Sequence, residues 1–540
     1  MNGRAERGQA DHTPDSAIHR DAAMARARRG EPFDLFIVGG GATGLGIALD
    51  AAARGLSVAL AEREDFAKGT SSRATKLVHG GVRYLAQGNV SLVREALHER
   101  RNMLDNAPHL ASPLPFLMPT YGAKGRFWDT PFYGIGLKLY DLLAGRQGLG
   151  GTDFLNAREA REVMPGVRDQ DLTGAVRYWD GQFDDARFAL ALARTAASKG
   201  ACLLNHTPVL GLLHAGDQVR GARLRDQESG AEFEVHARCV VNATGVWVDA
   251  VRRMNGAHDG DMVSPSQGIH LVVDRELFPG DHALLVPKTR DGRVLFAVPW
   301  LGKVLLGTTD TPRDRLDEEP RPLEEEIEFV LGESALYLAR PPRREDVRSV
   351  WVGLRPLVKP PSRGNGQTKT ISREHTIVVD PSGLVTVTGG KWTTYRAMAE
   401  DVMERCMDAG LIPRSHPGIT EHLRLAGAPR TSGQPLSAPP GPHLYGSDMD
   451  ALLALPGAEN ELHPGLTEAM VRFAVRMEGA RTVEDMLARR SRLLFLDARA
   501  AMEVAPTVAT IMAEELGPGF DAAASTRAFQ GLARGYTLSD

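Results

Sequence analysis

A glycine-rich turn between two short apolar strands constrains the fold of this chain more than any other feature. Residues 35–38 form an apolar run of the kind that a buried parallel strand needs. Gly39, Gly41 and Gly44 then complete a GxGxxG pattern. In this pattern the first glycine permits a tight turn, and the second lets a pyrophosphate approach the backbone. The third lets the following helix pack on the strand.

The residues after the glycines continue the same unit. We expect a helix from about residue 44 to residue 54, whose free N–H groups and positive dipole end face a phosphate. A second strand over 56–61 ends at Glu62, which lies 18 residues after Gly44. A carboxylate at this place accepts hydrogen bonds from ribose hydroxyls and disfavours a 2′-phosphate. The stretch therefore predicts a dinucleotide site, without distinguishing FAD from NAD.

Length and composition bound the function classes. A chain of 540 residues is expected to form two or three domains. The net charge of −4 gives no support for nucleic-acid binding, and no apolar run is long enough for a membrane-spanning helix. The three cysteines are far apart and form no CxxC pair, which favours a reducing compartment and no metal site. Residues 1–30 are polar and are predicted to be a disordered tail.

Three later stretches have the composition of ligand-binding turns. Residues 65–85 are dense in Gly, Ser, Thr, Lys, His and Arg, as in a loop that wraps a ligand. Gly245 follows an apolar strand in the sequence VVNATG, and Gly389 and Gly390 follow the strand 384–388. Such glycines let the backbone approach a ligand closely.

Between these turns, residues 262–310 contain strand-like runs separated by Gly, Pro or Asp, which predicts an antiparallel sheet. Aromatic and basic residues are mixed over 121–146, and this mixture is compatible with packing inside a domain or with a lipid headgroup layer.

Six motifs in fixed order then carry a resemblance. They are GGGATGLGIALDAAARGLSVALAERED, GTSSRATKLVHGGVRYL, VVNATGVW, GTTDTP, WVGLRPL and GGKWTTYR. Together they resemble the FAD-dependent glycerol-3-phosphate dehydrogenases of the bacterial aerobic type. The resemblance runs from about residue 33 to residue 396 and continues in the helical segment TVEDMLARRSRLLFLDA. One departure is Gln267, where many relatives are expected to have a lysine.

The resemblance implies an α/β fold like that of glycine and D-amino acid oxidases. A Rossmann-like FAD-binding domain would carry an inserted antiparallel β substrate domain and would be followed by a C-terminal helical domain. We predict that residues 31–110, 184–260 and 352–408 form the FAD-binding domain and residues 111–183 and 261–351 the substrate domain. A linker over 409–446 and a helical domain over 447–540 would follow.

The resemblance also implies site residues. The FAD-binding set is Gly39, Gly41, Gly44, Glu62, Thr70, Ser71, Ser72, Lys76, Gly245, Gly389, Gly390, Lys391, Thr393 and Thr394. The substrate-binding set is Arg83, Tyr84, Arg355, Arg373 and Lys391. Fixed cations of this kind suit a dianionic phosphate.

The implied reaction is oxidation of sn-glycerol 3-phosphate to dihydroxyacetone phosphate, with hydride passing from C2 to FAD N5 and electrons passing on to a quinone. Arg355 is expected beside the C2 oxygen. His79 and His270 are the candidate bases for the hydroxyl proton because imidazole titrates near neutral pH. Water remains an alternative proton acceptor.

Alternatives remain at this point. A glycerol-3-phosphate oxidase would use the same site with O2 as acceptor, and a related polyol phosphate is another substrate. An amine or amino-acid oxidase of the same fold would need a carboxylate clamp. A flavin-binding sensor or scaffold would need no catalysis. The expected location is cytoplasmic, peripherally associated with the inner face of the cell membrane, with a homodimer as a further expectation.

Overall fold

The first of two large sheets in the described ranges is built around β1 (Phe33–Val38), all but one of whose residues are buried. In the computed structural model, which describes residues 16–81, 89–122, 130–257, 260–359, 375–431 and 433–538, this sheet has the order β17-β18-β10-β1-β2-β7. The other strands on this path are β2 (Val58–Ala61), β7 (Cys202–Leu204), β10 (Glu232–Asn242), β17 (His375–Val379) and β18 (Leu384–Gly389). The five strands from β18 to β7 are parallel, so their carboxyl ends meet at one edge.

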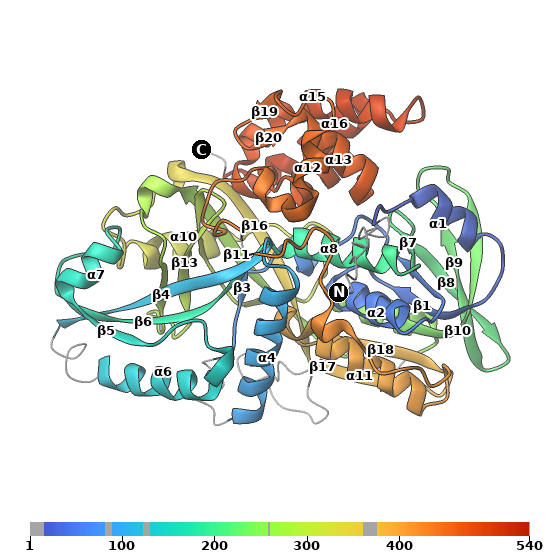
Figure 1. Cartoon of the computed structure of the whole chain (residues 1–540), viewed down its shortest axis with the longest axis horizontal. Helices are drawn as coiled ribbons and strands as arrows, with labels where there is room; N and C mark the ends of the chain where they lie inside the picture. Colours follow the sequence, from blue (N-terminus) through green and yellow to red (C-terminus); the bar gives the residue numbers. More distant parts are fainter. Residues whose placement is uncertain are drawn as a thin grey trace, which may run out of the picture.

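Helices cover one face of this sheet and a hairpin covers the other (Figure 1). Helices α2 (Ala42–Ala53), α8 (Asp185–Ser198) and α11 (Tyr395–Asp408) share a core with Leu35 and Ile37. Strands β8 (Val209–Ala215) and β9 (Gln218–Arg225), together with α1 (Arg20–Ala27) and α9 (Val248–Met254), pack on the side of Phe36 and Val38. Side chains that alternate along β1 therefore pack into the cores on both faces of the sheet, as expected of a buried parallel strand.

The prediction of a disordered tail over residues 1–30 is wrong from residue 20 onward, because residues 20–27 form helix α1. Arg20, Met24 and Ala27 are buried, and these positions share one face of a helix. The Arg20 guanidinium contacts Asp226 at 2.6 Å. Local composition misleads here because the buried face contains an arginine whose charge is neutralised by a residue 206 positions later.

The second sheet has the order β15-β11-β14-β13-β12-β4-β6-β3, with β16 on β11 and β5 on β6. Its strands are β3 (Leu77–Val78), β4 (Ala111–Tyr121), β5 (Asp153–Asn156), β6 (Leu172–Phe183), β11 (Val263–Asp274), β12 (Ala283–Val286), β13 (Leu295–Trp300), β14 (Lys303–Gly307), β15 (Thr311–Pro312) and β16 (Val347–Val358). All its pairs are antiparallel except β4 with β12. The inserted antiparallel sheet was thus predicted correctly.

One predicted domain boundary falls inside a strand. The boundary at residue 352 divides β16, which pairs with β11 from Val347 to Val358. Because a single strand belongs to one sheet, the second sheet extends to residue 358. Around this sheet lie α4 (Val90–Asn106), α6 (Thr130–Ala144), α7 (Ala157–Val163) and α10 (Glu324–Ser334).

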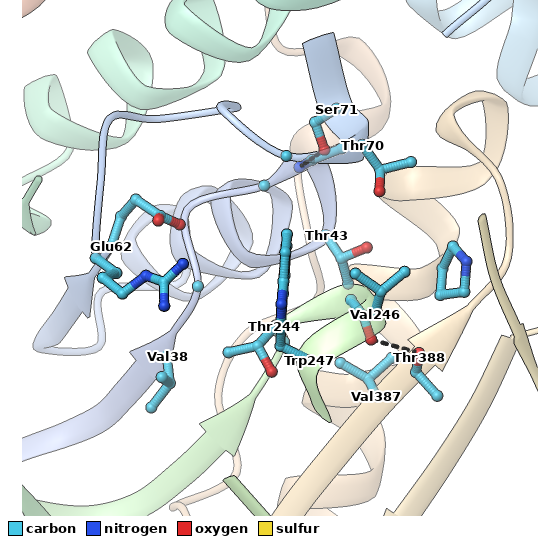
Figure 2. A pocket seen from close by; sticks show the side chains of 18 of the residues that line it. Val38, Thr43, Glu62, Thr70, Ser71, Thr244, Val246, Trp247, Val387 and Thr388 are labelled. Atoms are coloured by element: carbon cyan, nitrogen blue, oxygen red, sulfur yellow. Dashed lines mark hydrogen bonds between the residues drawn. The ribbon is translucent and has the colours of Figure 1, made fainter. Parts of the chain in front are cut away.

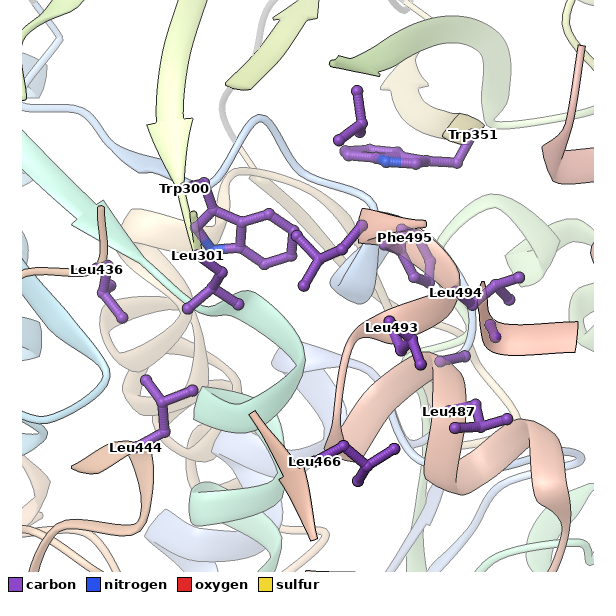
Figure 3. Packing of buried hydrophobic residues seen from close by; sticks show 14 of the residues in the cluster. Trp300, Leu301, Trp351, Leu436, Leu444, Leu466, Leu487, Leu493, Leu494 and Phe495 are labelled. Atoms are coloured by element: carbon purple, nitrogen blue, oxygen red, sulfur yellow. The ribbon is translucent and has the colours of Figure 1, made fainter. Parts of the chain in front are cut away.

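The C-terminal region is mostly helical and shares its core with the second sheet. It contains α12 (Met449–Leu453), a short hairpin of β19 (Glu461–His463) and β20 (Leu466–Thr467), α13 (Glu468–Glu478), a π-helical turn (Asp485–Arg490), α14 (Leu493–Leu496), α15 (Ala498–Leu516) and α16 (Ala522–Ala533). Figure 3 shows Phe495 packed near Trp351 and Leu493 nearby, within a cluster that also holds Trp300. The C-terminal region therefore shares one hydrophobic core with the second sheet.

The segment 409–446, predicted as a linker, packs on the rest of the protein. Leu425, Leu436 and Leu444 are buried, two of them in the core shared with the second sheet. Despite its Pro and Gly residues, this segment is therefore packed against the protein surface and is not a flexible linker. Across the described ranges, none of the helices combines the length and the apolar character that a bilayer crossing requires.

Candidate active site

A cavity of about 320 Å³ opens at the carboxyl ends of the parallel strands. This is where open α/β sheets bind their ligands. Its walls come from β1, β10 and β18, the turn into α2, and residues 62–71 (Figure 2). The predicted residues that line it are Gly39, Gly41, Glu62, Thr70, Ser71, Gly245, Gly389, Gly390 and Lys391.

Two glycines of the opening motif are required by the turn itself. Gly39 has φ +108°, and a Cβ there would lie 2.7 Å from the Ala243 carbonyl oxygen. A Cβ at Gly44 would lie 1.9 Å from the Gly39 carbonyl oxygen, so Gly44 lets α2 pack on the turn. Gly44 does not line the cavity.

Gly41 is different because an added Cβ there would closely approach only one side-chain atom of the protein. Its φ of −81° suits any residue, and a Cβ there would approach Ser71 Oγ at 3.0 Å. Gly41 is the N-cap of α2 and offers no side-chain oxygen to that helix. The missing side chain at this position therefore keeps the helix N-terminus open toward the cavity.

Glu62 lines the cavity and is held by backbone donors. Its Oε2 accepts from Gly40 N at 2.7 Å and its Oε1 from Glu64 N at 3.0 Å. Burial raises the pKa of Glu62, although these hydrogen bonds act in the opposite direction. The backbone thus fixes the carboxylate with lone pairs left for a ribose.

Thr70 and Ser71 join three separate parts of the cavity wall. Thr70 Oγ1 donates to the Leu354 carbonyl of β16 at 2.6 Å. Ser71 Oγ accepts from Ala42 N at 2.9 Å, and Trp392 Nε1 donates to the Ser71 carbonyl at 2.9 Å. The wrapping loop therefore connects the α2 N-terminus, the second sheet and the segment before α11.

The second and third glycine turns face the same cavity. Gly245, Gly389 and Gly390 have φ of +60°, +82° and +72°. Thr388 Oγ1 donates to the Gly245 carbonyl at 3.1 Å, which joins the two turns (Figure 2). Thr393 and Thr394 are buried in the turn that leads into α11 and do not line the cavity.

Several lining residues were not identified from sequence. Trp247 is the largest of them, and Figure 2 shows its ring standing among the labelled side chains of the pocket. Its position two residues after Gly245 in VVNATGVW was the available signal. Thr43, Thr244, Val246 and Thr388 carry no comparable signal because short polar and apolar residues are common in turns.

Lys76 does not line the cavity and instead lies in a buried cluster. Its ammonium contacts Asp185 at 2.8 Å, donates to the Ser72 carbonyl at 2.8 Å and sits 4.5 Å from the Trp351 ring centroid. Burial lowers the pKa of Lys76 to about 7, although Asp185 opposes that effect. The structure places Lys76, and Ser72 beside it, between the domains.

Arg355 lies on β16 directly before Pro356, which lines the cavity. Its guanidinium is 3.3 Å from Asp310 Oδ1 and donates to Thr308 Oγ1 at 3.3 Å. A Cβ at Gly268 would lie 2.5 Å from Arg355 Nη2, so a glycine on the neighbouring strand makes room for this arginine. The arrangement fixes a cation beside a hydroxyl group.

His79 and His270 have contrasting environments. His79 is 38% exposed, and its Nδ1 lies 3.5 Å from the buried carboxylate of Asp180. Burial raises the pKa of Asp180, but the hydrogen bond with His79 and the charge of Arg100 outweigh it and leave that pKa below its ordinary value. A carboxylate that stays ionised accepts a hydrogen bond from the imidazole and so fixes the orientation of its ring.

His270 is buried and stacked on Trp351 at 4.1 Å, with Thr75 Oγ1 2.9 Å from its Nε2. Burial, followed by the charges of Lys76 and Arg355, holds the pKa of His270 well below its ordinary value. His270 is therefore neutral and a weak base. Arg83, Tyr84 and Arg373 lie outside the described residues.

The cavity fits FAD on its own features. An α2 N-terminus with a glycine cap suits a pyrophosphate, and a fixed carboxylate at Glu62 suits a ribose. The turn of Gly389 and Gly390 leads into α11, where a helix N-terminus stabilises negative charge.

The comparisons with known proteins agree. A family model described as FAD dependent oxidoreductase matches residues 34–405, and one described as the C-terminal domain of alpha-glycerophosphate oxidase matches residues 442–522. The fold and the cavity define an FAD-dependent oxidoreductase of this class.

The relatives make the family more specific. The mitochondrial glycerol-3-phosphate dehydrogenase of Bos taurus is 41% identical and that of Homo sapiens 40%, each over 92% of this chain and 72% of the relative. The glycerol-3-phosphate dehydrogenase of Bacillus halodurans, solved with FAD, superposes with a TM-score of 0.76 at 28% identity over 96% of this chain and 98% of that one. The chain belongs to the FAD-dependent glycerol-3-phosphate dehydrogenase family.

Proposed function

We propose that this protein oxidises sn-glycerol 3-phosphate to dihydroxyacetone phosphate at the end of the cavity marked by Lys391 and Pro356, and that its electrons pass to a quinone. The observation that carries the proposal is the fixed cation Arg355, held beside Thr308 and adjacent to the cavity wall. FAD, when bound, supplies the acceptor for the hydride that leaves C2 of the substrate.

Different residues are proposed to bind the phosphate and to orient the reacting oxygen of the substrate. Lys391 lines the cavity at a glycine turn, where its ammonium suits a phosphate dianion. Arg355 is assigned to the C2 oxygen, because a fixed guanidinium favours the alkoxide character that develops as the proton leaves. Arg83, Tyr84 and Arg373 complete the predicted substrate set.

We assign the role of base, which accepts the proton of the substrate hydroxyl, to His79 and not to His270. The exposed imidazole of His79 faces the ionised Asp180, and Asp180 is itself held by Arg100 at 2.8 Å. His270 has a pKa well below the working range, which makes it a poor base. Its stacking on Trp351 supports a structural role in the wall of the site.

An anaerobic reduction experiment tests the proposed function. The purified yellow protein is mixed with glycerol 3-phosphate without oxygen, and flavin absorbance is followed. Bleaching with glycerol 3-phosphate, but not with glycerol or an amino acid, is the expected result. Absence of bleaching, or bleaching by amino acids, would overturn the assignment.

The electron acceptor needs a separate test because an oxidase would use the same site. We expect turnover to require an added quinone analogue. Stoichiometric hydrogen peroxide, formed from O2 without a quinone, would instead identify a glycerol-3-phosphate oxidase.

We further propose peripheral contact with the inner face of the cell membrane through α6. Leu139 and Leu142 of this helix are 46% and 77% exposed, and Lys138 lies between them and the helix start. An exposed apolar and basic helix suits an anionic lipid surface. Co-sedimentation with anionic vesicles, lost on changing Leu142→Glu, is expected; equal sedimentation of the variant would refute the use of this helix. The homodimer stays a prediction.

A further inference from the structure

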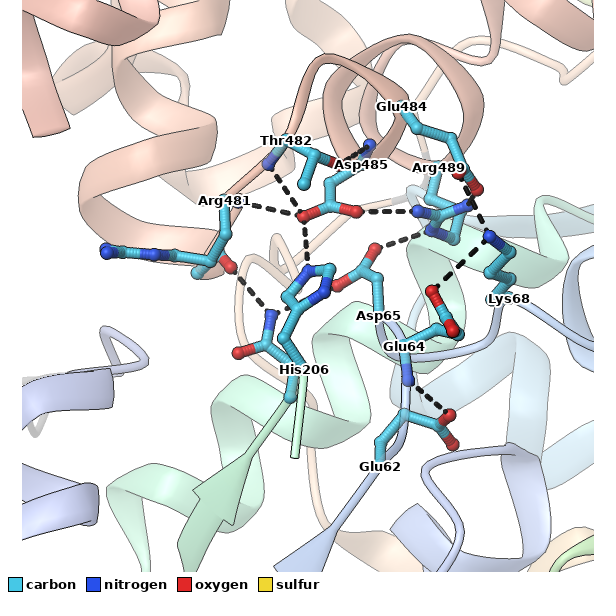
Figure 4. A network of polar contacts seen from close by, with 12 residues as sticks. Glu62, Glu64, Asp65, Lys68, His206, Arg481, Thr482, Glu484, Asp485 and Arg489 are labelled. Carbon is cyan, nitrogen blue, oxygen red and sulfur yellow. Dashed lines mark hydrogen bonds and ion pairs between the residues drawn. The ribbon is translucent and has the colours of Figure 1, made fainter. Parts of the chain in front are cut away.

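The loop that lines the cavity is held from outside by the C-terminal region. We call residues 62–76 the cofactor loop and residues 484–492 the arginine turn. The cofactor loop supplies Lys68, Gly69, Thr70 and Ser71 to the cavity wall. Figure 4 shows side chains of the arginine turn and of the cofactor loop pointing toward one another.

Asp65 is the centre of this contact. It is fully buried, and its Oδ2 accepts from Arg489 Nε at 2.5 Å and also from Arg490. Its Oδ1 accepts from Arg490 Nη2 at 3.1 Å and from Asn205 Nδ2 at 3.3 Å. Two arginines thus fix both oxygens of one carboxylate, which determines its orientation as well as its position.

Two further contacts hold the cofactor loop, one at a cavity-lining residue and one directly after the last of them. Lys68 Nζ contacts Glu484 at 3.0 Å. Arg492 Nη2 donates to the Ser72 carbonyl at 2.9 Å and to Asp185 Oδ1 at 3.0 Å. The lining residues 67–71 are therefore held before them at Asp65, within them at Lys68 and after them at Ser72, each time by the same turn.

The backbone of the arginine turn is shaped for this purpose. Residues Asp485–Arg490 form a π-helical turn, a conformation found frequently at functional sites. Asp485 holds Arg489 Nη2 at 2.8 Å and His206 Nε2 at 2.9 Å, and it caps the turn by accepting from Thr482 N at 3.0 Å. These contacts orient Arg489 before it reaches Asp65.

A metal site and a purely stabilising role both fit these contacts less well. Asp65, His206 and Asp485 are close enough for a metal ion, but both carboxylates already accept from arginines, so a cation there would meet positive charge. Stabilisation of the fold alone accounts poorly for buried charges, because desolvation cancels much of the attraction in a buried ion pair. What such pairs supply is a defined geometry.

We propose that Asp65, Arg489 and Arg490 are positioning residues for FAD, through which the C-terminal region completes the cofactor site. They act through Ser71, whose Oγ accepts from Ala42 N at the start of α2. A cofactor loop released from the arginine turn would shift Ser71 away from the helix N-terminus that suits the pyrophosphate. The inference rests on FAD binding in the cavity and not on the identity of the substrate.

The test compares two buried ion pairs made by the same C-terminal region. Asp65→Asn removes the charge on the cofactor loop. Glu478→Gln is the matched control, because Glu478 is equally buried and its side-chain Oε1 lies 3.0 Å from Arg187 of α8. Arg490 also donates to Glu478, but to its backbone carbonyl, which the substitution leaves in place. Apoprotein is prepared from each, and FAD is titrated by flavin fluorescence alongside thermal unfolding of the apoprotein.

We expect both variants to lower the unfolding midpoint, but only Asp65→Asn to raise the Kd for FAD, by tenfold or more. A Kd within twofold of wild type for Asp65→Asn, or an equal rise in Glu478→Gln, would overturn the proposal. If Asp65→Asn does not fold, Glu484→Gln removes the less buried contact to Lys68, and an increase of about threefold in Kd is expected. An unchanged Kd in that variant would count against the proposal. Bleaching of wild-type flavin by glycerol 3-phosphate tests the proposed function separately.

Discussion

Replacing Gly41 with alanine separates cofactor binding from folding. In the protein alone, the new Cβ meets Ser71 Oγ at 3.0 Å, so Ser71 needs to move by roughly 0.4 Å to reach an ordinary contact. That movement lengthens the 2.9 Å hydrogen bond from Ala42 N to roughly 3.3 Å, which weakens it without breaking it. With φ at −81° the alanine adopts the backbone without strain.

The two local effects on stability nearly cancel. Losing glycine at an N-cap costs about 0.5–1 kcal/mol. Restricting the unfolded chain returns about 0.4–1 kcal/mol. We therefore expect the unfolding midpoint of the apoprotein to stay close to that of the wild type.

FAD binding is expected to fall sharply in Gly41→Ala. A methyl group at the helix N-terminus blocks one or two charge-assisted hydrogen bonds to the pyrophosphate, each worth about 1.5–3 kcal/mol. Two orders of magnitude in Kd correspond to about 2.8 kcal/mol. Fluorescence titration of the apoprotein measures this, with Gly531→Ala in α16 as control, since nothing lies within 4 Å of its added Cβ. A Kd for Gly41→Ala within threefold of wild type would refute the assignment of Gly41 to the pyrophosphate.

Three further changes test other parts of the structure. Gly44→Ala places a Cβ 1.9 Å from the Gly39 carbonyl oxygen, so the free energy of unfolding of the apoprotein should fall by about 1–3 kcal/mol or more. Thermal unfolding should show a lower midpoint, and an unchanged midpoint would contradict the packing described. Arg355→Ala should abolish flavin reduction by glycerol 3-phosphate while FAD stays bound, and reduction at the native rate would remove Arg355 from the site. Burial, with Arg187 and Arg194 nearby, lowers the pKa of His109 from 6.5 to about 3. Because the unfolded chain binds that proton first, stability falls as pH drops below about 6.5, by about 1.4 kcal/mol at pH 5.5. Urea unfolding of His109→Gln should therefore show a smaller loss of stability between neutral pH and pH 5.5 than the wild type shows. An equal loss in both proteins would show that groups other than His109 cause the acid sensitivity.

The sequence predicted best where one residue type alone satisfies a backbone requirement. Gly39 and Gly44 are such residues, since a turn with φ +108° and a helix in contact with that turn exclude side chains. The register of strand, helix and acid around them follows from local spacing, and the structure reproduces it.

The sequence predicted poorly where a residue's role depends on partners far along the chain. Lys76 lies in a loop of polar residues, and that local composition favours assigning it to the cofactor. Its actual surroundings are Asp185, the Trp351 ring and the charge of Arg492, which come from three other segments. No spacing rule brings these residues together, so a buried lysine and a ligand-binding lysine have the same local sequence.

The same long-range contacts change how the domains are understood. As separate units, an FAD domain and a helical C-terminal domain would be expected to act independently. Here Asp65 and Ser72 of the cofactor loop are held by Arg489, Arg490 and Arg492, while Phe495 packs against Trp351 in the substrate sheet. One short segment thus contacts the loop that lines the cavity and the strand that carries Arg355. Because this segment contacts both sides, we expect the geometry between flavin and substrate to depend on the C-terminal region, although that region contributes no residue to the cavity wall in the described part of the chain.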